Sequence, residues 1–170
     1  MRPPISYNNA ARAVLKRGDF RNCMLRKISE LEQKSRIHLR LAQKILLAET
    51  GTVEQVLSIL SGSAIRVNVT QQRENAKTIH RRSVMINDAD KVLIRAYSKV
   101  FLSNLPKKIT QQVKEKQMGI GTIICNSHLE TFRKITEVGY DPVNKLVFRR
   151  YQIIYRKKVI FEIREELIDV

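Results

Sequence analysis

The sequence predicts one α+β domain, in which an antiparallel sheet of about six strands has helices packed on one face. Three observations lead to this fold class. Apolar residues recur three and four positions apart in the first third of the chain, as in helices, and later runs alternate apolar and polar residues, as in half-buried strands. The strand runs often follow one another through tight connections, which favours antiparallel pairing. With 170 residues, 43% of them hydrophobic, the chain is long enough to bury a core.

The domain itself is assigned to residues 37–170, and residues 1–36 to a basic N-terminal extension. Pro3-Pro4 and Gly18-Asp19 are typical of irregular chain, so the first 20 residues are expected to have no regular structure. A polar helix is expected from about Asn22 to Lys34. The extension is therefore predicted to be partly helical.

Two helices are expected at the start of the domain. The first covers about Ile37–Glu49, with apolar residues on one side. The second follows Thr52 and Gln55, whose spacing is that of a capping box, and it ends at Gly62. Thr52 is thus expected to cap a helix with its hydroxyl group.

Strand patterns follow, interrupted by two further helices. The expected strands are Ala64–Thr70, Ile79–Asn87, Lys91–Leu102, a short one through Cys125, Lys145–Tyr155 and Val159–Ile168. A helix is expected at about Leu105–Gln117. Another is expected after Ser127 and Glu130, a second capping box, because apolar residues then recur every three positions up to Gly139.

The composition argues against a membrane-spanning, a secreted or a zinc-binding protein. No apolar run approaches the roughly 20 residues of a membrane span, and no apolar segment follows the N-terminus as in a secretory signal. Cys23 and Cys125 lie far apart, without the spacing of a zinc site, so no metal is expected. These features favour a reducing compartment, the cytoplasm or, given a composition typical of A/T-rich genomes, the plastid stroma.

The charge raises nucleic-acid binding as one interpretation. The chain carries 32 Lys/Arg and 16 Asp/Glu, a net charge of +16, and residues 1–44 hold 11 of the basic and only three of the acidic residues. A basic N-terminal segment of this kind attracts polyanions. Only Tyr7 and Phe20 supply aromatic rings there, however, so base stacking has little support.

Three stretches, taken together, resemble the chorismate lyase family, and the likeness spans roughly residues 37–168. The first stretch is Ile45–Val53 with the helix and strand that follow it. The second is the hairpin formed by Ile79–Ile86 and Val92–Ser98. The third runs from Gly119-Ile120-Gly121 to the closing hairpin, which ends in Glu165-Glu166. The likeness is to the small branch of the family in archaea, cyanobacteria and red-algal plastids. Bacterial regulator domains share this fold, so the fold alone does not give catalysis.

The resemblance implies an enzyme that converts chorismate to 4-hydroxybenzoate and pyruvate, a step that feeds quinone or pterin-type pathways. Chorismate is a dicarboxylate whose ring becomes aromatic when the ether bond breaks, so no cofactor is expected. The protein has to hold two carboxylates, shape a dry pocket and assist proton movement.

Arg82 is the expected carboxylate-binding residue, because a guanidinium grips a carboxylate through two donors and stays charged. Alternation places Arg82 on one strand face with Val84 and Ile86, which favours an inward direction. Glu165 shares a face with Ile163 and is the expected acid or base, since a lone carboxylate among apolar residues has a raised pKa.

Four further positions are candidate ligand contacts. Ile120 and Gly121 are expected to line the pocket, where glycine lets the backbone approach a ligand closely. Thr52 stands at a helix start, where N–H groups favour anions, and one of the adjacent pair Arg149 and Arg150, here assigned to Arg150, is a candidate second carboxylate partner. Each has a simpler structural explanation: a turn, a helix cap or a solvated strand edge.

Two alternative functions remain open on sequence grounds. One is a non-catalytic domain of the same fold that binds a small carboxylate. The other is a basic nucleic-acid-binding protein that uses residues 1–36. The sequence does not distinguish a monomer from a dimer.

Overall fold

The computed structural model describes residues 20–170, and the chain divides into two compact units between His38 and Leu39. The described part of the first unit is dominated by helix α2, Phe20–Ser35, which confirms the expected polar helix. Exposed Glu30 lies within 3.4 Å of Arg26 and 3.8 Å of Lys34, one turn away on either side, as suits a solvated helix. The expectation for residues 1–19 lies outside the described residues.

The second unit is built on one six-stranded sheet in the order β1-β2-β3-β6-β5-β4, with every neighbouring pair antiparallel. Its strands are β1 (Arg66–Glu74), β2 (Thr78–Ile86), β3 (Val92–Phe101), β4 (Phe132–Asp141), β5 (Leu146–Tyr155) and β6 (Lys158–Leu167). The expected α+β class with about six antiparallel strands is confirmed.

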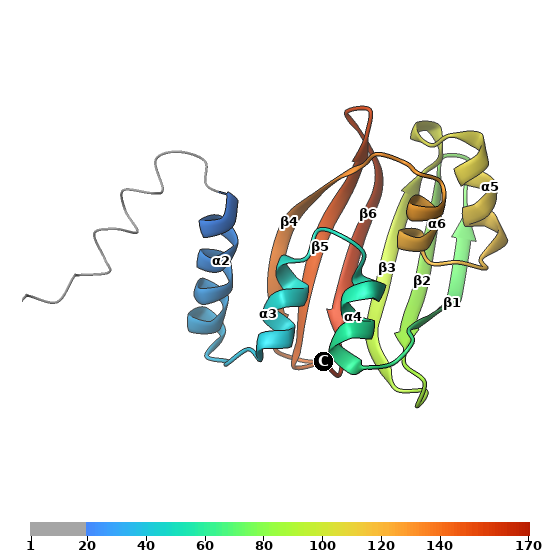
Figure 1. The fold of residues 1–170 in the computed structure, drawn as a ribbon. Coiled ribbons are helices and arrows are strands. Elements are labelled where there is room, and N and C mark those ends of the chain that lie inside the picture. The colour runs from blue at the N-terminus through green and yellow to red at the C-terminus, as the bar shows by residue number, and fades with distance from the viewer. Residues whose placement is uncertain (1–19) are drawn as a thin grey trace, which may run out of the picture. The chain divides into compact units, whose positions relative to one another are not determined.

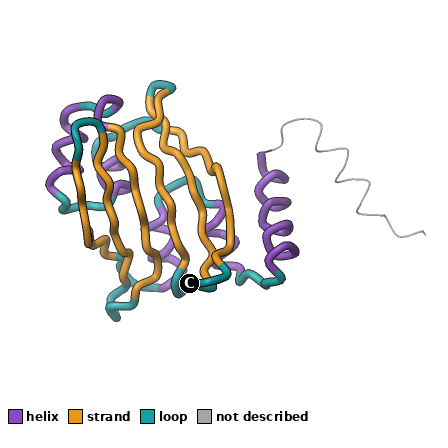
Figure 2. Tube along the Cα trace, turned by 180° about the vertical axis from the view of Figure 1, so that it is seen from behind, coloured by secondary structure: helices purple, strands orange, loops and turns teal. Residues whose placement is uncertain are grey.

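The helices of this unit lie on one face of the sheet, while the other face has no helix over it (Figures 1 and 2). They are α3 (Leu41–Ala48), α4 (Val53–Ser61), the single turn η1 (Leu102–Asn104), α5 (Lys107–Glu115) and α6 (Ile120–Asn126). Helix α4 ends at Gly62, whose φ of 64° is the left-handed cap that glycine adopts without strain. Among the described residues, no helix is long and apolar enough to cross a membrane.

The chain crosses the sheet once. After β3 it passes through η1, α5 and α6 to the far edge, where β4 begins, and the meander β4-β5-β6 then returns until β6 pairs with β3. The crossover makes β6 a central strand with neighbours on both sides. Its inner-face side chains Phe161 and Ile163 are accordingly buried beneath the helices.

Two expected elements in the crossover are wrong. The expected short strand through Cys125 is helix α6, and the expected helix that follows it is strand β4. The three-residue spacing of apolar positions in this stretch fits a helix, but Thr136 and Val138 are β-branched and the whole segment pairs with β5. Tertiary pairing outweighs the local pattern here, and the Ser127–Glu130 capping box does not form.

Candidate active site

A cluster of polar side chains lies on the helix-covered face of the sheet. Arg81 comes from β2, Arg149 and Tyr151 from β5, and Glu165 from β6. Side chains alternate along a strand, so each of these residues points inward while its neighbours point outward. All four are buried, with exposed fractions of 2%, 1%, 6% and 2% in that order.

Arg149, Tyr151 and Glu165 form one buried hydrogen-bonded unit. Nε and Nη2 of Arg149 each lie 2.8 Å from Oε2 of Glu165, and the Tyr151 hydroxyl donates to Oε1 at 2.8 Å. Nη1 of Arg149 donates to the backbone oxygen of Glu49. Glu165 is thus a doubly bonded partner of Arg149, and the expectation of a lone carboxylate is wrong.

The unit has a fixed charge state. Burial, the largest single effect, acts to lower the pKa of Arg149, but Glu165, Tyr151 and Glu49 together outweigh it and the pKa is raised. The pKa of Tyr151 is raised well above its usual value, first by burial and then by Glu165. Arg149 is therefore charged and Tyr151 is protonated at physiological pH.

Arg81 is different because it has no carboxylate partner among the described residues. Its Nη2 donates to the backbone oxygen of Met118, while Nε and Nη1 are buried without any hydrogen-bond partner. Burial without a counter-charge lowers its pKa to about 10, which still leaves the guanidinium charged. A buried cation with two unsatisfied donors is costly, and an anionic ligand would satisfy it.

A small cavity lies beside these groups, beneath α4 and α6. Its volume is about 30 Å³, and Glu54, Ser98, Gly119, Ile120, Gly121, Arg133, Tyr151 and Glu165 are among the residues that line it. Arg81 adjoins it, because Ser98 is its register partner on β3 and Met118 directly precedes Gly119. The space suits about one water molecule, so a six-membered ring enters only if the walls move apart.

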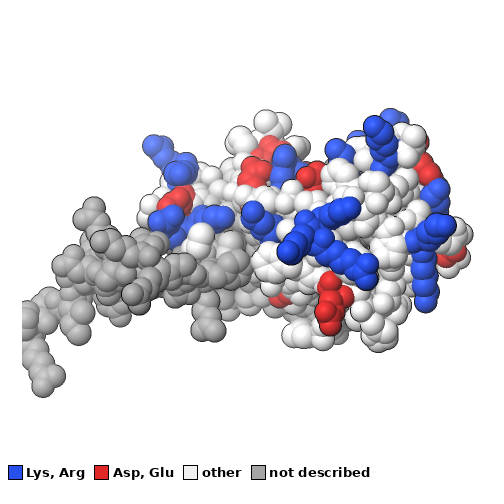
Figure 3. Space-filling model, turned by 90° about the horizontal axis from the view of Figure 1, so that it is seen from above, with Lys and Arg blue, Asp and Glu red and all other residues white. Residues whose placement is uncertain are grey.

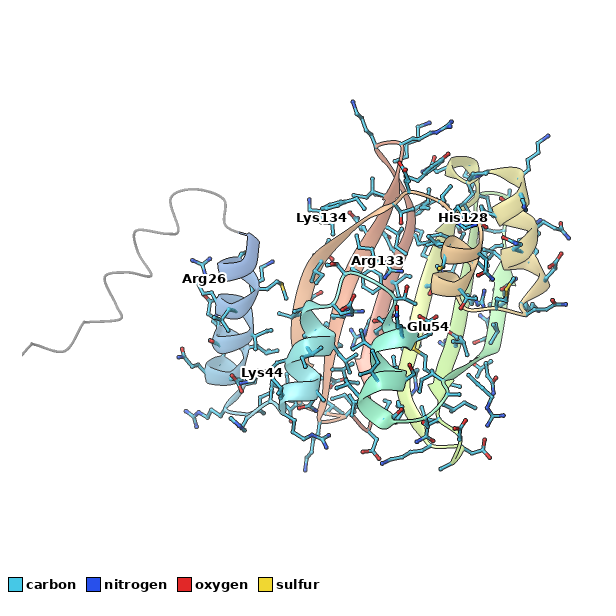
Figure 4. All side chains as sticks on the ribbon, in the orientation of Figure 1. Arg26, Lys44, Glu54, His128, Arg133 and Lys134 are labelled. Carbon is cyan, nitrogen blue, oxygen red and sulfur yellow. The ribbon has the colours of Figure 1, made fainter. Side chains whose placement is uncertain are left out.

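Glu54, on the first turn of α4, lies against the start of α6. A Cβ added at Gly119 or Gly121 would come within 2.7 Å or 2.8 Å of a carboxylate oxygen of Glu54. The pKa of Glu54 is raised, mainly by burial and to a smaller extent by the nearby charge of Glu165. Its own backbone N–H and the charge of Arg133 lower the pKa, but not enough to cancel the rise. Figure 4 labels Glu54 and Arg133, which extend from α4 and β4.

The structure brings together three of the residues predicted for the site. Glu165 points inward with Ile163 and Phe161, and Ile120 and Gly121 line the same cavity. Thr52 precedes α4 but does not line the cavity, and its hydroxyl makes no capping bond. The N–H of Gln55 instead donates to the backbone oxygen of Thr52.

The expected inward direction of Arg82 is wrong, and Arg150, a candidate carboxylate partner, also points outward. Both side chains are exposed on the face of the sheet that the helices leave uncovered, so Arg82 and Glu165 lie on opposite faces. The argument for Arg82 used Ile86, but the register of β2 shifts between Met85 and Ile86. Beyond such a bulge, the burial of Ile86 no longer reports the face of Arg82.

The sequence argument missed Arg81, Glu54 and Tyr151 as site residues. Arg81 shares its face with Ser83 and Met85, a less apolar set than that of Arg82, so the pattern pointed to the wrong member of the pair. Glu54 is an ordinary residue of a helix first turn by sequence. Only its position against Gly119 and Gly121 reveals it.

Comparison with known proteins finds one matching family and several similar proteins. Residues 41–167 match the family described as "Chorismate pyruvate-lyase Rv2949c-like". The chain is 31% identical over 141 residues to "Putative lyase MJ0807" of Methanocaldococcus jannaschii, covering 72% of this chain and 76% of that protein.

Two mycobacterial proteins named chorismate pyruvate-lyase are also similar. Identity is 22% over 156 residues to that of Mycobacterium tuberculosis, covering 74% of this chain and 78% of the relative. It is 27% over 139 residues to that of Mycobacterium leprae, covering 65% and 66%. The matched region contains the whole sheet and the helices that cover it.

Proposed function

Since this chain belongs to the chorismate pyruvate-lyase Rv2949c-like family, we propose that it cleaves chorismate to 4-hydroxybenzoate and pyruvate at the inner-face cavity. The observation that carries this proposal is Arg81, a buried cation with two unsatisfied donors beside that cavity. A substrate carboxylate would supply the counter-charge that the described residues do not provide. Such charge-assisted hydrogen bonds are among the stronger polar contacts in proteins.

The reaction balances without a redox partner. The ether bond between the ring and the enolpyruvyl oxygen breaks, and the ring carbon that carries the hydroxyl loses its hydrogen as a proton. The ring becomes aromatic 4-hydroxybenzoate, and the enolpyruvate gains a proton on its methylene carbon to give pyruvate. One proton is therefore taken from the ring and one is given to the leaving group.

Two carboxyl groups in the cavity suit these two transfers. Glu165, which accepts hydrogen bonds from Arg149 and Tyr151, is the proposed acceptor of the ring proton. The pKa of Glu54 is raised by burial, which favours a protonated carboxyl group that can donate to the enolpyruvate. Neighbouring carboxyl groups with different environments are a common arrangement for acid and base roles.

Substrate entry requires the cavity to widen. The walls that can separate are α4, which carries Glu54, and the Gly119–Gly121 segment at the start of α6. We therefore propose that chorismate binds with an outward movement of α4 from α6, after which the site closes again and excludes water.

The test compares two neighbouring arginines on opposite faces of the sheet. The purified protein is incubated with chorismate, and 4-hydroxybenzoate is measured by absorbance after chromatography. Arg81→Ala should lower kcat/KM by about 100-fold or more, because a charged contact to the substrate is lost. Arg82→Ala is the matched control and should leave kcat/KM within about threefold of the parent protein.

Two outcomes would contradict the proposal. One is a folded parent protein that forms no 4-hydroxybenzoate from millimolar chorismate. The other is an equal loss of activity in both variants, which would mean that Arg81 contributes no more to the reaction than Arg82 does. Circular dichroism and thermal unfolding of each variant check that a loss of activity is not a loss of fold.

A second candidate function is binding of a small carboxylate without turnover. It is favoured by Glu165, both of whose carboxylate oxygens already accept hydrogen bonds from protein groups. In that case 4-hydroxybenzoate would raise the Tm of the parent protein but not of Arg81→Ala, with no product formed from chorismate. Supply of 4-hydroxybenzoate to quinone synthesis, and a cytoplasmic or plastid location, belong to the lyase proposal as expectations.

A further inference from the structure

The face of the sheet opposite the proposed active site carries a cationic surface. It is a wide hollow of about 970 Å³ to which all six strands contribute, and no helix covers it (Figure 2). Its lining includes five outward Lys/Arg residues, Arg73, Arg82, Lys99, Arg150 and Arg164, and two glutamates, Glu74 and Glu162, and the buried Arg81 also borders it. We call these five basic residues the outer basic face.

The strand register sets these side chains in rows across the sheet. Arg82 is the register partner of Tyr97, Tyr97 of Arg164, and Arg164 of Arg150. Neighbouring strands lie about 4.8 Å apart, so this row spans roughly 14 Å from β2 to β5. A continuous band of this length can contact several successive anionic groups on one chain.

Most of this charge is not neutralised by the protein. Among the described residues, Arg73, Arg82 and Lys99 have no carboxylate within ion-pair distance, whereas Arg150 lies 3.2 Å from Glu137 and Arg164 3.1 Å from Glu166. Glu74, on the rim, pairs with Lys114. Three cations therefore face the hollow without an ion-pair partner among the described residues, and a polyanion would supply one.

The positive charge of the hollow argues against two other binding partners, a second copy of the chain and the chain's own N-terminal residues. A second copy of the chain would bring the same cationic face against this one, and like charges in contact cost free energy. The N-terminal residues 1–19 are also unsuited, since they carry Arg2, Arg12, Lys16 and Arg17 and a single acid, Asp19. The occupant that fits must be negatively charged along its length.

The rings beneath the arginines indicate which polyanion fits. The guanidinium of Arg164 lies 3.9 Å from the ring centre of Phe148, and that of Arg82 lies 5.5 Å from the ring centre of Tyr97. Such contacts hold a guanidinium plane in place, and both rings and guanidinium planes are surfaces on which unpaired bases stack. A duplex hides its bases, so a single strand uses this surface better.

We propose that the outer basic face binds single-stranded nucleic acid, with phosphates on the Lys and Arg side chains and bases against Arg82, Tyr97 and Arg164. The outer basic face shares no residue with the proposed lyase site, so the two activities can be tested separately. It is also separate from the N-terminal basic segment. The expected binding is sequence-tolerant and weakens with salt.

Fluorescence anisotropy with a labelled oligouridylate of about 12 nucleotides tests this proposal, a length within the range of known single-strand sites. The test variant, Arg73→Glu/Lys99→Glu, reverses two charges in the hollow. The matched control, Lys107→Glu/Lys108→Glu, makes the same change of charge on exposed positions of α5, on the helix side. The test variant should weaken binding by about 10-fold or more, and the control by less than about threefold.

Competition experiments with unlabelled polyanions show which kind of partner the outer basic face prefers. Oligothymidylate should compete about as well as oligouridylate, whereas duplex DNA and phosphatidylserine vesicles should compete poorly at equal anion concentration. Equal weakening in both variants, or equal competition by duplex or vesicles, would overturn the proposal. Each variant should still turn over chorismate if the parent does, so failure here and failure of the lyase proposal are distinguishable.

Discussion

Arg81 and Arg149 are both almost fully buried, yet only Arg149 has a carboxylate partner among the described residues. Removing a guanidinium from water costs several kcal/mol unless another charge compensates it. Glu165 compensates Arg149, and the Tyr151 hydroxyl satisfies the second carboxylate oxygen. The uncompensated Arg81 is the part of this site that a ligand would complete.

Glu54 provides a pH-dependent test at the residue scale. Its pKa is raised above the usual value of a glutamate carboxyl group, mainly by burial, so the folded protein holds this proton more tightly than the unfolded chain. Its contribution to stability is therefore present below the unfolded pKa and is lost as pH rises through the folded pKa. Above that value, the protein carries a desolvated charge at this position.

We predict that Glu54→Gln is more stable than the parent at pH 7 and about equally stable at pH 4. The variant carries no ionisable group at position 54, so this position no longer contributes to the fall in stability with rising pH. Urea unfolding of both proteins at the two pH values measures the difference. A parent protein that gains stability relative to the variant on going from pH 4 to pH 7 would contradict this account.

Strand β4 shows how pairing decides the structure of an element. Gly139 on β4 is the register partner of Phe148 on β5, and the Phe148 ring lies against the glycine backbone. A Cβ at position 139 would come within 2.4 Å of that ring. The ring is held from its other side by Arg164, so it has little freedom to move away.

We therefore predict that Gly139→Ala destabilises the protein by about 1–3 kcal/mol, the usual cost of overpacking. The measurement is the free energy of unfolding in urea. Phe148→Leu removes the ring, so adding it to Gly139→Ala should cost less than the sum of the two single changes. Additive costs in this double-mutant cycle would show that the ring contact does not limit position 139.

At the scale of the whole molecule, net positive charge dominates the surface. The chain carries +16, and in the view of Figure 3 Lys and Arg side chains outnumber Asp and Glu side chains. Like charges on a compact molecule repel each other, and dissolved salt screens this repulsion between exposed groups. The Arg149–Glu165 pair is buried, so salt affects it much less.

We predict that raising NaCl from about 0.05 M to 0.3 M increases the free energy of unfolding by on the order of 1 kcal/mol, as repulsion is screened. Urea unfolding at each salt concentration gives the value. The Lys107→Glu/Lys108→Glu variant, whose net charge is lower by four, should gain less. A midpoint that falls with salt in the parent protein would mean that exposed ion pairs outweigh repulsion.

The sequence by itself determined the class of fold and most of its elements. Alternation identified five of the six strands, helical spacing identified α2, α3, α4 and α5, and Gly62 ended a helix as its position indicated. It also placed Glu165 on the inner face and identified Ile120 and Gly121, which line the cavity. These features follow from local periodicity and turn chemistry, which a short window of sequence contains.

Only the tertiary structure decided that residues 132–141 form a strand, which arginine of each adjacent pair turns inward, and which charges meet. The alternation of side chains along a strand predicts that Arg81 and Arg82 point to opposite faces, but it does not predict which of these faces the helices cover. That choice depends on register and bulges, which are fixed when distant strands pair. The contacts of Glu54 with Gly119 and Gly121 likewise exist only because α4 and α6 lie together over the sheet.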